Sequence, residues 1–97
     1  MSGLTLCAAI GERKRVSFRL RKIEFTVEPY SVGYPNPDDS AGGNPLTLRG
    51  ISGGGWQDFE VKFMNNIQTM SETFEVNRTD YRPLSIVLCD VFGKVWR

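Results

Sequence analysis

The fold class of this 97-residue chain is decided by one stretch, Val16-Ser17-Phe18-Arg19-Leu20-Arg21-Lys22-Ile23-Glu24-Phe25-Thr26-Val27-Glu28. Apolar and polar residues alternate on both sides of the Arg21-Lys22 pair, which is the pattern of strands with one buried face. No glycine separates the two halves, so Arg21-Lys22 is either a tight turn or part of one continuous strand, and we favour a turn. Pro29 follows and is expected to end regular pairing, because proline lacks a backbone N–H.

The flanking segments predict one helix and further strands. Apolar residues recur at helical spacing near the N-terminus and predict a helix over Leu4–Arg15. Further strands are predicted at Leu46–Ile51, at Phe59–Phe63 with an extension towards Phe74, and within Ser85–Trp96. Turn-forming residues fill Gly33–Pro45, Ser52–Gly55 and Asn77–Pro83.

These elements predict a mainly β protein, a small, strongly bent sheet or barrel of about five strands with a short N-terminal helix. Closing a sheet removes its exposed edges, which favours such architectures in small β proteins. Residues 1–97 are expected to form a single domain, because the length is close to the lower limit for one hydrophobic core.

Composition excludes several classes of protein. No apolar run approaches the roughly 20 residues that cross a bilayer, so we expect no membrane partner. The short apolar N-terminus lacks a preceding positive charge and does not resemble a secretory signal, and a cytoplasmic location is expected. Cys7 and Cys89 lie at opposite ends of the chain, and in a cytoplasmic protein free, buried thiols are favoured over a disulfide.

Neither metal binding nor catalysis is predicted. The chain contains no histidine, the commonest general base, and two cysteines alone do not complete a zinc site. Asp38 and Asp39 lie in a Pro/Gly-rich loop, where adjacent acids are more often solvated turn residues than an acid/base pair. The glycines before Trp56 lack the Gly-Lys-Ser/Thr ending of a phosphate-binding loop. We therefore expect no catalytic residue, no metal and no cofactor.

Basic residues favour a binding function. The net charge is only +1, but half of the twelve Lys and Arg residues lie between Arg13 and Lys22. Arg19, Arg21, Arg49 and Lys62 are each predicted on the outer face of a strand. Guanidinium groups suit phosphate and tyrosine rings stack on bases. The alternative is that these charges only solvate the sheet and protect it from edge pairing.

The order of motifs resembles the WYL domains of bacterial regulators. The resemblance runs over residues 9 to 83 and rests on Ala9–Phe18, on Phe25–Tyr30 with Gly33, on Leu46–Gly50, on Trp56–Val61 and on Glu72–Phe74 with Arg78, Tyr81 and Pro83. Leu46 and Thr47 replace the tryptophan and tyrosine of the family's name-giving triplet. The resemblance implies a stand-alone Sm-like β-barrel that acts in transcription regulation or near phage-defence systems and binds nucleotides or single-stranded nucleic acid.

The leading hypothesis is a non-catalytic regulatory domain that binds single-stranded nucleic acid or a nucleotide-like anion. Its predicted contacts are Arg19, Arg49 and Lys62 to phosphate, with Tyr30 and Tyr81 as stacking or hydrogen-bonding groups. The alternative is a protein-interaction or homo-oligomerisation module that uses Phe92, Val95 and Trp96 at a C-terminal β edge.

Overall fold

The computed structural model describes residues 2–35, 45–76 and 80–93, and within them the chain is mainly β. The elements are α1 (Ser2–Gly11), β1 (Lys14–Leu20), β2 (Ile23–Tyr34), β3 (Thr47–Ser52), β4 (Gly55–Glu60), the 3₁₀ turn η1 (Val61–Phe63), β5 (Asn65–Thr73) and β6 (Ile86–Asp90). No helix in these ranges is both long and apolar enough to cross a bilayer.

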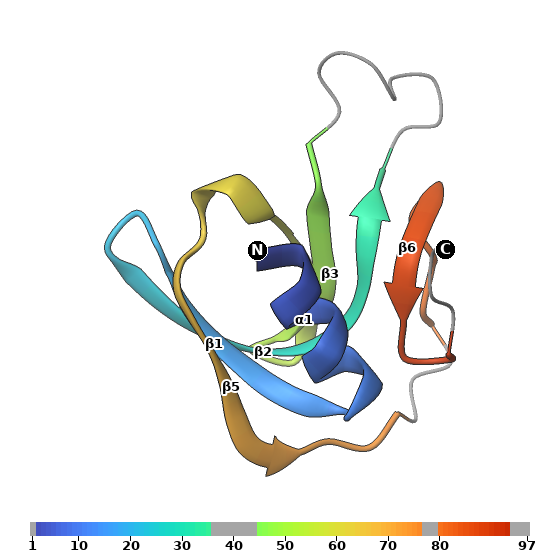
Figure 1. The fold of residues 1–97 in the computed structure, drawn as a ribbon, viewed down its shortest axis with the longest axis horizontal. Coiled ribbons are helices and arrows are strands. Elements are labelled where there is room, and N and C mark those ends of the chain that lie inside the picture. The colour runs from blue at the N-terminus through green and yellow to red at the C-terminus, as the bar shows by residue number, and fades with distance from the viewer. Residues whose placement is uncertain (1, 36–44, 77–79, 94–97) are drawn as a thin grey trace.

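The six strands form one antiparallel, strongly bent sheet that does not close into a barrel (Figure 1). Its strand order is β4-β3-β2-β1-β5, and β6 pairs with β2 outside this path. The predicted fold class is confirmed: a mainly β protein with one short N-terminal helix. Of the two forms expected, bent sheet and barrel, the chain adopts the open sheet.

Strand β2 is central because its two halves pair with different partners. Residues Ile23–Val27 pair with β1, whereas the half that begins at Glu28 pairs with β3. Residues Ser31–Tyr34 also pair with β6, which therefore lies on the opposite edge of this half from β3. The prediction that Pro29 ends regular pairing is wrong, because β2 continues to Tyr34.

Pro29 and the glycine opposite it lie where β2 changes partners. Pro29 lies between the last residue paired to β1 and the first paired to β6, at a point where a missing N–H removes no bond to either. It faces Gly50 of β3, and the β2–β3 register shifts just beyond it. A Cβ on Gly50 would lie 2.4 Å from the carbonyl oxygen of Glu28, so glycine permits this close approach.

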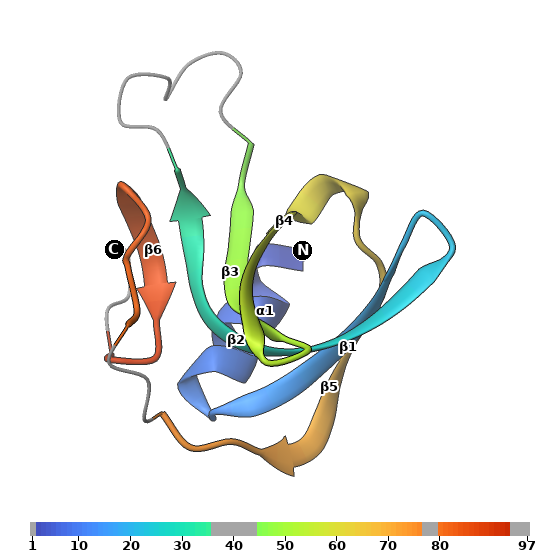
Figure 2. The same cartoon turned by 180° about the vertical axis from the view of Figure 1, so that it is seen from behind.

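The helix covers one face of the sheet and completes the core. Leu6, Ala9 and Ile10 of α1 are buried, at the i, i+3, i+4 spacing of one helical face. They join a cluster that includes Val16, Phe18, Val27, Val32, Leu48 and Phe59. Figure 2 shows the other side of the molecule, where β3 and β4 lie in front of the helix.

Several predicted boundaries are wrong. The helix ends at Gly11 rather than Arg15; Arg13 has a φ of +54°, and β1 already begins at Lys14. The strand predicted through Phe63 ends at Glu60, because the chain turns through η1 into β5. Regular pairing continues through Gly33, where a loop was predicted to begin. The Asp38-Asp39 pair lies outside the described residues.

The turns predicted at Arg21-Lys22 and at Ser52–Gly55 are confirmed. Leu20 pairs with Ile23, so that Arg21 and Lys22 alone connect β1 to β2. Ser52 pairs with Gly55, and the two glycines between them have φ values of +63° and +84°. Such two-residue hairpins require positive φ at central positions.

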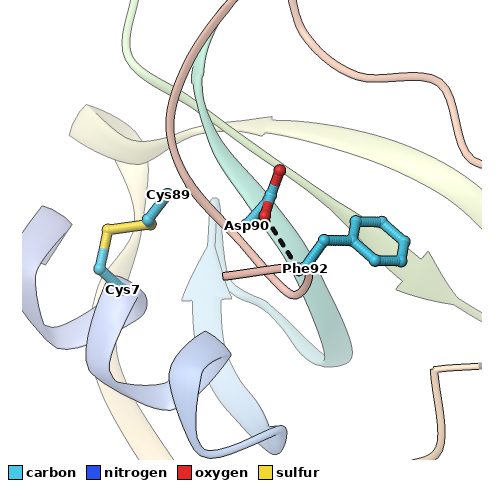
Figure 3. The surroundings of a disulfide bond; sticks show 4 residues. All are labelled: Cys7, Cys89, Asp90 and Phe92. Atoms are coloured by element: carbon cyan, nitrogen blue, oxygen red, sulfur yellow. Dashed lines mark hydrogen bonds between the residues drawn. A yellow bond between two sulfur atoms is a disulfide. The ribbon is translucent and has the colours of Figure 1, made fainter. Parts of the chain in front are cut away.

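The expectation of free thiols is wrong, because Cys7 and Cys89 form a disulfide with a Cα–Cα distance of 5.9 Å. Figure 3 shows the bond joining α1 to β6. The two residues are 82 positions apart, and only the packing of α1 beside β6 brings them together. The bond ties the helix to a strand that is paired only with β2 among the described strands.

Reducing this disulfide is expected to lower the free energy of unfolding by about 2 to 4 kcal/mol, because the unfolded chain then regains the entropy of a long loop. Thermal unfolding monitored by circular dichroism, with and without reductant, measures the change. The double variant Cys7→Ala/Cys89→Ala is the control and should not respond to reductant. Two titratable thiols in the native, unreduced protein would contradict the bond.

Substituting Gly50 by alanine is expected to destabilise the fold by about 2 kcal/mol or more, since the new methyl group meets the Glu28 carbonyl across the bend. The matched control is Gly55→Ala, which has no heavy atom within 4 Å of its added Cβ and should change stability by less than about 0.5 kcal/mol. Chemical denaturation of both variants tests the contrast. Equal stabilities would show that the bend does not depend on this glycine.

Candidate functional site

One candidate surface lies at the tip of the β1–β2 hairpin. We call it the hairpin-tip patch and define it by Arg19, Arg21, Lys22, Lys62 and Phe63. The guanidinium carbon of Arg21 lies 5.9 Å from the centre of the Phe63 ring, and the Lys62 ammonium lies 5.1 Å from the same point. Phe63 is 44% exposed. The patch thus holds four cationic side chains beside one accessible aromatic ring.

In the described part of the chain, one ion pair involves a cation of this patch. Arg19 lies 3.9 Å from Glu24, and both side chains are more than half exposed, so the pair is weak. The β1–β2 register places Arg19 directly across from Glu24. Among the ion pairs observed in the described residues, none involves Arg21, Lys22 or Lys62. The described part of this patch thus carries a local excess of positive charge, although the net charge of the chain is only +1.

The turn that carries this patch is strained. Arg21 and Lys22 have φ values of +49° and +72°, in the left-handed region that asparagine and glycine favour. Holding a residue with a long side chain there costs on the order of 1 kcal/mol. The chain therefore places two cations at the two positions of the hairpin where they are least favoured by the backbone.

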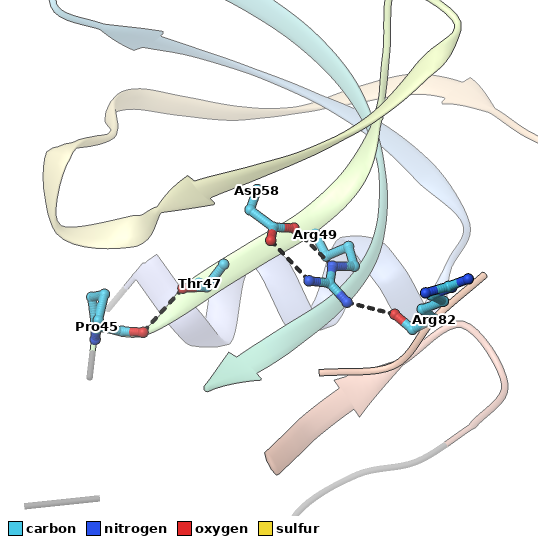
Figure 4. A network of polar contacts seen from close by, with 5 residues as sticks. All are labelled: Pro45, Thr47, Arg49, Asp58 and Arg82. Atoms are coloured by element: carbon cyan, nitrogen blue, oxygen red, sulfur yellow. Dashed lines mark hydrogen bonds and ion pairs between the residues drawn. The ribbon is translucent and has the colours of Figure 1, made fainter. Parts of the chain in front are cut away.

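A second candidate site is a pocket of about 440 Å³ beside the β3–β4 hairpin. We call it the Arg49 pocket and define it by its lining residues, Arg49, Trp56, Gln57, Asp58, Asp80 and Arg82. Arg49 and Asp58 face each other across the hairpin and form a bidentate pair, with Nε–Oδ1 and Nη2–Oδ2 distances of 2.8 Å. Figure 4 shows that the remaining Arg49 nitrogen, Nη1, donates to the backbone oxygen of Arg82 at 2.7 Å.

These contacts keep Arg49 protonated and hold its side chain in one orientation. Hydrogen bonding to Asp58 raises the pKa of Arg49, and partial burial opposes this shift to a smaller extent. Three of its five N–H groups already donate to the protein, one from each nitrogen. An incoming anion would therefore meet a cation whose charge Asp58 already neutralises.

An aromatic cluster backs the pocket. The Tyr30 ring lies 4.8 Å from Trp56, edge to face, and 5.9 Å from Tyr81. Tyr30 is completely buried, so it lies away from any ligand at the surface of this structure. Tyr81 is half-buried and also contacts Trp56, with 5.7 Å between ring centres.

The five predicted contact residues thus separate into two groups. Arg19 and Lys62 belong to the hairpin-tip patch, whereas Arg49, Tyr30 and Tyr81 lie at or behind the Arg49 pocket. Their roles as ligand contacts stay predictions.

Sequence reasoning missed Phe63, Trp56 and Asp58 as functional candidates. Phe63 was assigned to the buried face of a strand that in fact ends at Glu60. Asp58 had a usable signal: a two-residue turn at Gly53-Gly54 places residue 58 opposite residue 49. Trp56 carried no such signal, because its proximity to Tyr30 and Tyr81 depends on the bend of β2.

Comparison with known proteins names no function for either candidate site. The chain matches no family model, no curated protein and no solved structure.

The raised pKa of Tyr81 predicts that the protein loses stability in alkali. Burial raises the pKa of its phenol and Asp90 adds to this shift, while Ser31 and Arg49 oppose it. In the unfolded chain Tyr81 ionises near pH 10, whereas in the folded chain it stays neutral to higher pH. The free energy of unfolding should therefore fall as pH rises above about 10. Denaturation curves at pH 8 and pH 11 measure this fall.

The variant Tyr81→Phe should show a smaller fall between these two pH values, because it removes the group whose ionisation favours unfolding. The matched control is Tyr34→Phe. An equal fall in wild type and Tyr81→Phe would contradict the raised pKa.

Proposed function

We propose that the chain is a non-catalytic binding domain for single-stranded nucleic acid, with the hairpin-tip patch as its contact surface. The observation that carries this proposal is the position of Arg21 and Lys62 against the exposed ring of Phe63. Proteins that bind single strands without sequence preference combine cations that follow the phosphates with aromatic rings on which bases stack.

The energies of cation–π contacts and of base stacking allow a base to stack on the Phe63 ring. A cation–π contact at an exposed site contributes about 0.5 to 1 kcal/mol. Stacking of a base on an aromatic side chain contributes about 1 to 3 kcal/mol. A base therefore displaces a cation from the Phe63 face at a net gain. The released Arg21 or Lys62 remains close enough to pair with the phosphate next to that base.

Strain at the turn supports the same proposal. Asparagine and glycine would form the β1–β2 turn without the cost that Arg21 and Lys22 incur. Charges that served only to keep the sheet soluble could be placed elsewhere on the exposed strand faces without this cost. Unfavourable backbone geometry that persists in a small protein is more often found at functional positions.

The wider role rests on the sequence alone. The resemblance to WYL domains supports a regulatory function, in transcription or near phage-defence systems. In this role, nucleic-acid binding by this domain would change the activity of a partner. This part of the proposal concerns biological context and does not depend on which surface makes the contact.

The double variant Arg21→Asn/Lys22→Gly separates binding from folding. It should raise the free energy of unfolding by about 1 kcal/mol, because it removes turn strain. It should also weaken binding and reduce the slope of log K against log salt by about 1.4, since each phosphate contact to a single strand contributes about 0.7. Fluorescence polarisation of labelled single-stranded DNA and RNA at several salt concentrations measures the slope.

Two further variants complete the test. Phe63→Ala should weaken binding about tenfold, a stacking contribution of about 1.4 kcal/mol, while Phe92→Ala, which removes another exposed ring, should leave it unchanged. Lys14→Ala is the charge control, because Lys14 is paired with Glu12. Wild-type binding that is absent, or equally strong in the hairpin-tip variants, would overturn the proposal.

The alternative function, protein interaction through the C-terminal β edge, has one favourable observation. Phe92 is 60% exposed just after β6, with its ring 5.3 Å from Tyr81. Val95 and Trp96, the other two residues predicted for this edge, lie outside the described residues. A complex held by such apolar contacts would persist at high salt, whereas phosphate binding weakens.

A further inference from the structure

The Arg49 pocket differs from the hairpin-tip patch in its charge. Its lining holds two guanidinium groups, Arg49 and Arg82, and two carboxylates, Asp58 and Asp80, so the formal charges cancel. The Arg49–Asp58 pair is bidentate and its cation also donates to the Arg82 backbone. A phosphate that approached the remaining N–H groups of Arg49 would lie beside the Asp58 carboxylate, which is electrostatically unfavourable.

The pocket also presents a flat apolar wall. Trp56 is partly exposed at the pocket, and the Tyr30 and Tyr81 rings pack against it. Rings held in this way are fixed in orientation before a ligand arrives, which reduces the entropy lost on binding. A planar ligand gains most from such a wall, because stacking requires two flat surfaces.

Around this wall the lining supplies both donors and acceptors. The Gln57 amide and the Arg82 guanidinium carry donors that can serve a ligand, and the carboxylate oxygens of Asp58 and Asp80 carry acceptors. An uncharged ligand that suits this lining carries donors and acceptors together on the edge of a flat ring. A volume of about 440 Å³ lies in the range of small-molecule sites.

We infer that the Arg49 pocket binds an uncharged nitrogen heterocycle of the nucleobase type, presented as a nucleoside, and that it discriminates against the corresponding phosphate. This site is separate from the proposed nucleic-acid surface and does not depend on it. The Arg49–Asp58 pair acts in it as a neutral, fixed hydrogen-bonding edge rather than as a phosphate clamp.

The fluorescence of Trp56 reports ligand binding in the Arg49 pocket. The chain has two tryptophans, so the variant Trp96→Phe leaves Trp56 as the only indole. Its fluorescence is titrated with adenosine, guanosine, cytidine and uridine, with their 5′-monophosphates and with inorganic phosphate. At least one nucleoside should cause a saturable change with a Kd on the order of 0.1 to 1 mM, as expected for a ligand of this size. Its monophosphate should bind more weakly.

The variant Asp58→Asn reverses the selectivity if the inference holds. It releases Arg49 and leaves the lining with a net positive charge, so nucleoside binding should weaken and monophosphate binding should tighten about tenfold. Glu72→Gln, which removes one carboxylate charge from the exposed strand β5, is the matched control and should change neither affinity. Gln57→Ala alters an exposed lining side chain and should weaken nucleoside binding without loss of the fold, as checked by circular dichroism.

Three results would overturn the inference: no nucleoside response, tighter binding of the monophosphate or inorganic phosphate by the wild type, or unchanged selectivity in folded Asp58→Asn. The hairpin-tip variant Phe63→Ala keeps the two proposals distinguishable. It should weaken oligonucleotide binding and leave the nucleoside titration unchanged, so either proposal can fail while the other stands.

Discussion

The bend of β2 at Pro29 is the constraint on which the rest of the structure depends. One twelve-residue strand pairs with β1 before this point and with β3 and β6 after it. At the change of partners Pro29 lacks an N–H where neither β1 nor β6 requires one, and Gly50 opposite it has no side chain to meet the Glu28 carbonyl. The helix α1 packs against this bent sheet, on β1 and β5 as well as on β2 and β6.

The same bend separates the two candidate surfaces. The half of β2 before Pro29 carries the hairpin tip away from β6 (Figure 1), and η1 brings Phe63 and Lys62 beside Arg21 at this tip. The other half carries Tyr30 under Trp56 and Tyr81. The disulfide between Cys7 and Cys89 ties the helix to the β6 side of the molecule, so the two halves share one core.

The two surfaces use arginine in opposite ways. At the hairpin tip, cations are exposed, weakly opposed and held on a strained turn, an arrangement suited to long-range attraction of phosphates. In the Arg49 pocket, the cation is neutralised by Asp58 and held in one geometry, which favours shape and hydrogen-bond recognition of an uncharged ligand. Local sequence does not distinguish these environments, since Arg19 and Arg49 both occupy polar positions of strands.

The sequence by itself determined the elements that depend on neighbouring residues: the alternating strands, the Arg21-Lys22 and Gly53-Gly54 turns, the N-terminal helix and therefore the mainly β class. The turn at Gly53-Gly54 sets the register between β3 and β4, which made the Arg49–Asp58 pair predictable in principle. Only the tertiary structure decided the continuation of β2 through Pro29, the exposure of Phe63, the burial of Tyr30 and the joining of Cys7 to Cys89. Each of these depends on contacts between residues far apart in the chain, as does the close approach of Gly50 in β3 to Val27 and Glu28 in β2.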